Sequence, residues 1–98
     1  MEIDSSIIQW AEERGLFSSP NPYGQAEKTV EEALEVLRAT HTGNFKELID
    51  GIGDVYITLV ILASMNGLTV DKCVKVAYNE IKNRTGITEG GVFIKDSQ

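Results

Sequence analysis

Apolar residues recur three and four positions apart along most of the sequence, which is the spacing of an α-helix with one buried face. The first such segment predicts a helix over residues 4–14 that stops at Gly15. Two prolines and a glycine exclude regular structure over residues 19–24, and a second helix is expected over residues 25–40. The apolar arc of this second helix consists of Ala26, Val30, Ala33, Leu34 and Leu37.

Two further helices complete the pattern. The third is expected over residues 45–65, directly after the turn HTGN. Thr69 is a suitable cap for the fourth, which continues until Arg84 and Gly86 end it. The tail GITEGGVFIKD predicts a turn and a short extended piece. Because consecutive helices are joined by short loops, the sequence predicts an all-α fold, an antiparallel four-helix bundle in a single domain over residues 1–98.

Composition and charge fit a small globular domain. Of the 98 residues, 42% are hydrophobic and 24% are charged, which places the chain outside the disordered class. At this length only about two-thirds of the unfolded surface can be buried, so self-association is a natural supplement to folding. The formal charge of -6 opposes the binding of nucleic-acid polymers and favours the binding of cations.

The sequence also predicts where the protein resides. Its longest apolar run covers nine residues, 55–63, whereas a membrane span needs about twenty. The single cysteine, Cys73, cannot form an intramolecular disulfide, and no basic-then-apolar leader precedes the first helix pattern. The expected location is therefore a reducing cytoplasm, with no membrane partner.

The third predicted helix carries a stripe of acids toward its apolar half. At about 100° per residue, Glu47, Asp50 and Asp54 fall within about 60° of arc. The same stripe continues as Ile57 and Ile61, and the helix beyond Asp54 is apolar nearly all round, so these acids are expected to face inward. Buried carboxylates are unfavourable unless a cationic group meets them.

The second predicted helix has a matching acidic turn in EKTVEEALEV, formed by Glu31, Glu32 and Glu35. Antiparallel packing of the two helices across the short HTGN turn would bring both acidic turns together. Carboxylates from two rigid helices suit a hard divalent cation, and Mg²⁺ is the expected ion. The alternative is a solvated helix face; a second acidic turn on an otherwise apolar helix favours the metal site.

Several other residues carry weaker chemical signals. Gly51 and Gly53 each weaken a helix by about 1 kcal/mol relative to Ala, which indicates close packing of a neighbouring helix or access for a ligand. Trp10 is expected in the core rather than as a base-stacking platform. His41 and Cys73 lie outside any nucleophile pattern, so no Ser-His-Asp or Cys-His chemistry is supported.

The segment KTVEEALEV, followed by ELIDGIGDVYITLVI, resembles the MazG-like all-α nucleoside triphosphate pyrophosphohydrolases. The hallmark of that family is an ExxE turn on one helix and an ExxD turn on the next. The resemblance covers residues 25–96, and the tail AYNEIKNRTGITEGGVFIKD is similar to the short phage-type members. Where the family often reads EELGD, this chain reads DGIGD, so Asp50 aligns with the first acid and Gly51 with the second.

The resemblance implies a Mg²⁺-dependent hydrolase that cleaves a nucleoside triphosphate between the α and β phosphates, and a homodimer or dimer of dimers. A carboxylate would orient or deprotonate the attacking water, and Glu32 and Glu35 are the catalytic candidates. The implied metal ligands are Glu32, Glu35, Asp54 and Asp50, with Glu31 and Glu47 as auxiliaries. The substrate-binding candidates are Lys28, Asn79, Lys82 and Arg84.

A function of another class stays open. Asp50 and Gly51, standing in place of two acids, favour a non-catalytic helical module that dimerises or senses metal. From composition alone, lysines on a polar helix face are solvated, whereas the resemblance favours phosphate binding by Asn79 and Lys82. Nothing in the sequence specifies the base or the sugar of the substrate.

Overall fold

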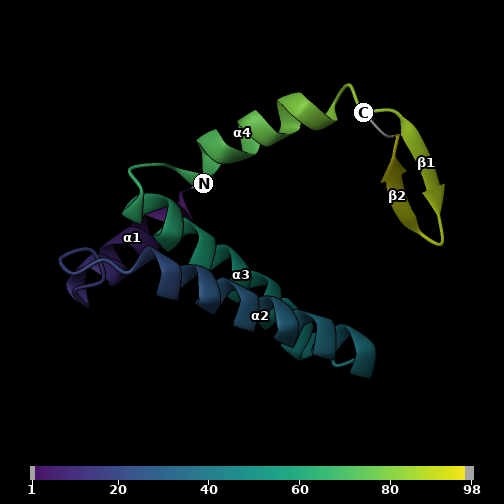
Figure 1. The fold of residues 1–98 in the computed structure, drawn as a ribbon. Coiled ribbons are helices and arrows are strands. Elements are labelled where there is room, and N and C mark those ends of the chain that lie inside the picture. The colour runs from purple at the N-terminus through teal and green to yellow at the C-terminus, as the bar shows by residue number, and fades with distance from the viewer. Residues whose placement is uncertain (1, 97–98) are drawn as a thin grey trace.

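The computed structural model of the protein describes residues 2–96, in which four helices are followed by a two-stranded antiparallel hairpin (Figure 1). The elements are α1 (Ile3–Glu13), α2 (Pro22–Thr42), α3 (Phe45–Met65), α4 (Val70–Ile81), β1 (Gly86–Glu89) and β2 (Val92–Lys95). The described chain is therefore mainly helical, as predicted, with a small sheet where the sequence predicts a turn and a short extended piece.

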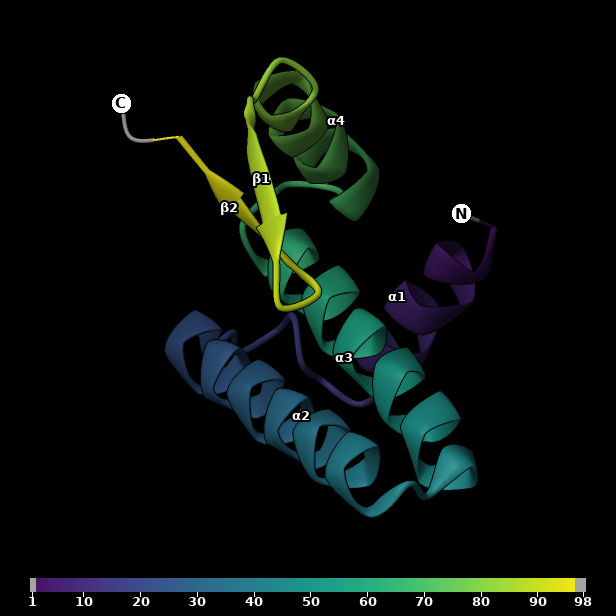
Figure 2. The ribbon, with the colours of Figure 1, turned by 90° about the vertical axis from the view of Figure 1, so that its right-hand side faces the viewer.

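The α2 and α3 helices lie side by side and antiparallel, and α1 packs on the other side of α3 (Figure 2). Gly43 ends α2 with a left-handed φ of 72°. The Asn44 side chain then accepts a hydrogen bond from the backbone N–H of Glu47 at 3.1 Å and starts α3. The predicted third helix over residues 45–65 is confirmed, and the turn between the two helices is only Gly43 and Asn44.

The beginning of α2 corrects the sequence-based prediction, because residues 22–24 are helical rather than irregular. The Asn21 side chain accepts a hydrogen bond from the backbone N–H of Gly24 at 3.1 Å, which caps the helix. Pro22 occupies the first helical position, where its missing N–H has no partner to lose. The proline therefore begins the helix instead of excluding it.

The buried core lies between α1 and α3, with Ile7 and Ala11 packed against Val60 and Ile61. The Tyr56 hydroxyl donates a hydrogen bond to Asp4 Oδ1 at 2.7 Å and ties the start of α1 to the middle of α3. Trp10 does not join this core: its side chain is on the rim, and the residue is 46% exposed. The core position predicted for Trp10 is therefore wrong.

The face that α2 turns toward α3 is more polar than its apolar arc. Thr29 donates a hydrogen bond to the Thr58 hydroxyl at 2.9 Å, and Gln25 Nε2 donates to the Thr58 carbonyl at 3.2 Å. The apolar arc points outward instead, since Leu34 is 53% and Leu37 is 66% exposed. Small and hydrogen-bonded side chains let the two helices approach closely, and they leave an apolar surface uncovered within one chain.

The α4 helix starts where predicted, because the Thr69 side chain accepts a hydrogen bond from the backbone N–H of Lys72 at 3.2 Å. It ends at Ile81, short of the predicted stop at Arg84. The helix extends from the end of α3 away from α2 (Figure 1), with no buried residue and no contact to α2. Within one chain the four helices therefore do not close into a bundle.

The C-terminal hairpin pairs Ile87 with Ile94. Gly90 and Gly91 form its turn with positive φ angles of 58° and 78°, a conformation that favours glycine. At its open end the Thr85 hydroxyl donates to the Asp96 carboxylate at 2.6 Å.

Of the helices in residues 2–96, only α3 is long and apolar enough to cross a membrane by length and composition. The core helix of a soluble protein meets the same criterion. Here α3 is flanked by α1 and α2, and it carries Glu47, Asp50 and Asp54.

Candidate functional site

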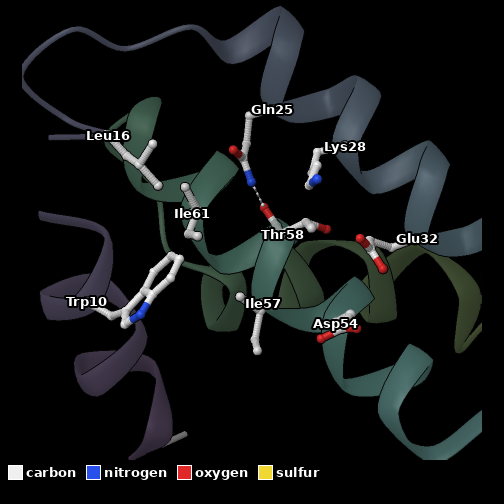
Figure 3. Close-up of a pocket in the computed structure, with 9 residues that line it drawn as sticks. All are labelled: Trp10, Leu16, Gln25, Lys28, Glu32, Asp54, Ile57, Thr58 and Ile61. Atoms are coloured by element: carbon white, nitrogen blue, oxygen red, sulfur yellow. Dashed lines mark hydrogen bonds between the residues drawn. The ribbon is translucent and has the colours of Figure 1, made fainter. Parts of the chain in front are cut away.

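The acids of α2 and α3 face the groove between the two helices. Glu32 from α2 and Asp54 from α3 line one cavity and point toward each other (Figure 3). About one turn farther toward the turn between α2 and α3, Glu35 and Asp50 line a second, more polar cavity. The structure therefore places these acids along one groove, as the two acidic turns predict.

The facing carboxylates perturb one another. Partial burial raises the pKa of Glu32 above its ordinary 4.5, and the negative charges of Glu35 and Asp54 raise it further. Burial also raises the pKa of Asp54 above its ordinary 3.8, together with the charge of Asp50 and a hydrogen bond to it. Both groups thus hold their protons more strongly than a free carboxylic acid does, because like charges converge where water is partly excluded.

The two auxiliary acids differ in position. Glu47, in the first turn of α3, lines the second cavity with Glu35, Asp50 and Arg38. Glu31 lines neither cavity, and its carboxylate lies 3.8 Å from Lys28 Nζ on the exposed surface of α2. The structure therefore brings Glu47 to the acidic groove and leaves Glu31 outside it.

The arrangement of these side chains determines whether they can hold a metal ion. Carboxylate oxygens are the donors that Mg²⁺ prefers, and rigid helices supply them from two sides. In the described part of the chain, however, no three Asp, Glu, His or Cys side chains are close enough together to hold an ion. The groove has the right donors, spread more widely than a closed coordination shell.

The substrate-binding candidates are divided between two places. Lys28 lines the first cavity with Glu32 and Asp54. Asn79 and Lys82 lie on or directly after α4, which does not contact α2. Arg84 lies beyond α4 with Nη2 3.9 Å from the Glu80 carboxylate. One chain therefore brings Lys28 to the acids and leaves the other three apart.

Two residues that line the cavities, Gln25 and Arg38, are not among the site residues predicted from the sequence. Gln25 borders the first cavity. Its position follows from helical spacing, because it shares one face of α2 with Lys28 and Glu32, which lie three and seven residues farther along the sequence. Arg38 follows Glu35 by about one helical turn, so the same spacing rule places it beside Glu35 at the second cavity. The place of Trp10 at the first cavity does not follow from the sequence, because helical periodicity does not say which side of α1 faces the groove.

Comparison with known proteins identifies one relative. The chain is similar to the uncharacterized 18.2 kDa protein in the rep-hol intergenic region of Haemophilus phage HP1 (strain HP1c1), with 34% identity over 65 residues. The match covers 66% of this chain and 40% of the phage protein, so the chain spans less than half of that relative. No protein-family model and no solved structure matches the chain. These comparisons assign no function to the chain, and the chemistry of the groove is the remaining guide to one.

Proposed function

We propose that the protein is a Mg²⁺-dependent nucleoside triphosphate pyrophosphohydrolase of the MazG-like kind. The observation that carries this proposal is the pair Glu32 and Asp54, which face each other from two antiparallel helices. Two more acids, Glu35 and Asp50, continue the same groove. Converging carboxylates with raised pKa values are typical of sites that bind a cation or move a proton.

The metal would be held by Glu32, Glu35, Asp50 and Asp54, and Glu47, which lines the same cavity as Glu35 and Asp50, would assist. When bound, Mg²⁺ supplies positive charge that neutralises the phosphate oxygens. The auxiliary role of Glu31 has less support, because its carboxylate lies beside Lys28 on the outer surface.

Glu32 and Glu35 are the proposed catalytic residues. In the reaction, water adds to the α phosphorus, the bond from that phosphorus to the bridging oxygen breaks, and pyrophosphate leaves. A carboxylate accepts the proton of the attacking water, and its efficiency rises as its pKa approaches the working pH. The raised pKa of Glu32 suits that role. Asp54, also raised, sits on the opposite wall of the groove.

The substrate contacts would come from two chains. Lys28 is already in the groove, whereas Asn79, Lys82 and Arg84 belong to a segment that does not reach it. We propose a homodimer or dimer of dimers in which the α4 helix of a second copy completes a four-helix bundle. The exposed arc around Leu34 on α2 and the unburied α4 supply the apolar surfaces that such an assembly needs.

An assembly of this kind would also cover much of the apolar surface of α3. We therefore propose a soluble, cytoplasmic protein that binds neither a membrane nor a nucleic-acid polymer. The formal charge of -6 supports the last point, because a polyanion is repelled by it.

Two observations favour a second function. Gly51 occupies the position of an expected acid, and the described acids do not form a closed ligand group. A non-catalytic helical module that dimerises or senses metal would need no complete coordination shell. It would bind Mg²⁺ without turning over any nucleotide.

Pyrophosphate release separates the two functions. The full chain is incubated with a panel of ribo- and deoxyribonucleoside triphosphates, with Mg²⁺ and then with a chelator. The expected result is Mg²⁺-dependent release of pyrophosphate and a nucleoside monophosphate, lost in Glu32→Gln. Glu27→Gln is the matched control, because Glu27 is exposed on the same helix and lines neither acidic cavity. Mg²⁺ binding without turnover of any nucleotide would favour the regulatory module.

A further inference from the structure

The cavity that holds Glu32 and Asp54 extends well beyond the acids. It has a volume of about 350 Å³, within the range of about 300 to 1,000 Å³ of small-molecule sites. Three helices and one loop border it, because side chains from α1, α2, α3 and the loop after α1 all contribute (Figure 3). Its apolar wall consists of Trp10, Leu16, Ile57 and Ile61. Such a wall is unnecessary for a metal site and indicates an organic ligand.

Trp10 is held in place at this wall. The Arg14 guanidinium lies over the indole at 4.3 Å from the ring centroid. Arg14 Nη1 also donates a hydrogen bond to the Trp10 carbonyl at 3.1 Å, which fixes the guanidinium against the ring. The indole extends from α1 toward Ile57 and Ile61 (Figure 3). Trp10 therefore lines the cavity with an indole over which the Arg14 guanidinium lies.

Gln25 supplies an oriented polar group at the same end of the cavity. Its Nε2 donates to the Thr58 carbonyl at 3.2 Å, which fixes the amide plane. The amide still has one N–H and one oxygen for a ligand. The Thr58 hydroxyl is already occupied, because it donates to the Val55 carbonyl and accepts from Thr29. The polar edge that faces the apolar wall is thus mainly the amide of Gln25.

The order of groups along α2 fits a nucleotide. Gln25, Lys28 and Glu32 share one helical face and all border the cavity. A rise of about 1.5 Å per residue separates Gln25 from Glu32 by about 10 Å. A nucleotide has a similar length between the hydrogen-bonding edge of its base and its α phosphate. The aromatic and amide groups therefore lie on one side, and the cationic and acidic groups lie toward the phosphates.

We propose that this cavity is the nucleobase pocket, in which Trp10 stacks on the base and Gln25 hydrogen-bonds to its edge. The inference rests on the proposed function for the identity of the ligand, and it adds the two residues that determine which base is accepted. Removal of an aromatic side chain that stacks on a base weakens binding about tenfold or more at comparable sites. A side chain that reads the base edge rejects bases that leave its hydrogen bonds unmade.

The chain contains a single tryptophan, so its fluorescence reports on this pocket alone. The full chain is titrated with the uncharged nucleosides, ribo and deoxy, in chelator, so that neither phosphate nor metal contributes. The expected result is a saturable change of Trp10 emission with a subset of bases. Gln25→Leu should weaken that binding about tenfold and flatten the preference among bases.

Variants connect the pocket to turnover. Trp10→Leu should raise the KM for the accepted triphosphate by about tenfold with a smaller change in kcat, and Trp10→Phe should restore most of the loss. Phe45→Leu is the matched control, because Phe45 is an exposed aromatic residue at the far end of the α2 and α3 hairpin. Far-ultraviolet circular dichroism checks that each variant keeps its helices.

The outcomes separate this inference from the proposed reaction. Nucleoside binding that Gln25→Leu weakens supports the pocket even when no triphosphate is hydrolysed, in which case only the reaction is wrong. Hydrolysis whose KM and base preference are the same in Trp10→Leu, Gln25→Leu and the unaltered chain would overturn the pocket and leave the reaction standing. A chain that binds neither nucleosides nor triphosphates would overturn both.

Discussion

Val36 on α2 packs directly onto the backbone of Gly51 on α3, so closely that a Cβ at position 51 would lie 3.1 Å from Val36 Cγ2. Gly51 is buried, whereas a Cβ at the nearby Gly53 would meet nothing within 4 Å. Close helix packing therefore explains Gly51, and it leaves little room for the acid that the MazG-like pattern would place there. Gly53 has no packing role in the described chain.

The two glycines give a paired stability test. Gly53→Ala should raise the free energy of unfolding by about 1 kcal/mol, because alanine favours a helix interior and here meets no neighbour. Gly51→Ala should gain less or lose stability, since the new methyl group must displace Val36. Urea denaturation of both variants measures the difference. An equal gain at both positions would show that Val36 moves freely and that packing does not explain Gly51.

Asp54 is the sharpest test of the metal site. Without metal, Asp54→Asn should melt a few degrees above the unaltered protein, because it removes one of the converging charges. Millimolar Mg²⁺ should then stabilise the unaltered protein more than the variant, since an ion that binds only the folded state adds to its stability. Melting temperatures with chelator and with Mg²⁺ provide both comparisons. If the variant melts lower without metal and gains equally from Mg²⁺, Asp54 is a structural acid.

The raised pKa values predict an unusual pH dependence without metal. Between their ordinary values, 4.5 for Glu32 and 3.8 for Asp54, and their higher folded values, the folded state binds more protons than the unfolded state does. Stability from these groups is therefore complete below the ordinary values and is lost as the pH rises through the folded ones. In chelator, the protein should melt higher at about pH 5 than at about pH 7.5. Asp54→Asn should show a smaller difference, and a steady rise of stability toward pH 7.5 would contradict the prediction.

Assembly is tested by mass. Light scattering at micromolar concentration should give a multiple of the 10.8 kDa chain. Leu34→Glu should shift the mass toward the monomer, because it places a charge on the exposed apolar arc of α2. Thr42→Glu, exposed at the end of the same helix, is the control and should leave the mass unchanged. A monomeric unaltered chain would remove the second copy from the proposed site.

Lys82 tests whether α4 takes part in the reaction. Lys82→Ala should lower kcat/KM about tenfold or more with little change in stability, because an exposed lysine contributes little packing and can stabilise phosphate charge. Lys72→Ala, on the first turn of the same helix, is the control. Catalytic efficiency that is unchanged for every accepted triphosphate would exclude Lys82 from the site.

Local sequence patterns predict the four helices, but they do not predict which helix faces pack against one another. The α3 bounds follow from the sequence because Asn44 caps it and its apolar run is long. The start of α2 does not, because a loop proline and the first residue of a helix look alike until the Asn21 cap is known. The apolar arc containing Leu34 misleads for another reason. Periodicity identifies a face that must be covered, and it does not say whether the same chain covers it.

In the candidate site, too, positions within one helix are predictable from the sequence, whereas contacts between distant segments are not. The acidic turns predict that Glu32, Glu35, Asp50 and Asp54 share a groove, because spacing within a helix and a short turn determine it. The place of Asn79 and Lys82 depends on contacts that one chain does not make. No spacing rule within one sequence reports such contacts.

The exposure of α4 affects both its stability and the order in which the helices fold. A helix of 12 residues without a buried side chain has little to stabilise it, since isolated helices shorter than about 12 to 15 residues are marginal in water. The antiparallel pair of helices α2 and α3, by contrast, forms from neighbouring segments and should fold early and independently. In the proposed assembly, dilution would unravel α4 first and leave the acidic groove formed, so protein concentration would act as an effector of the affinity for a phosphate-bearing ligand. Activity per chain should rise with protein concentration until α4 is fully ordered.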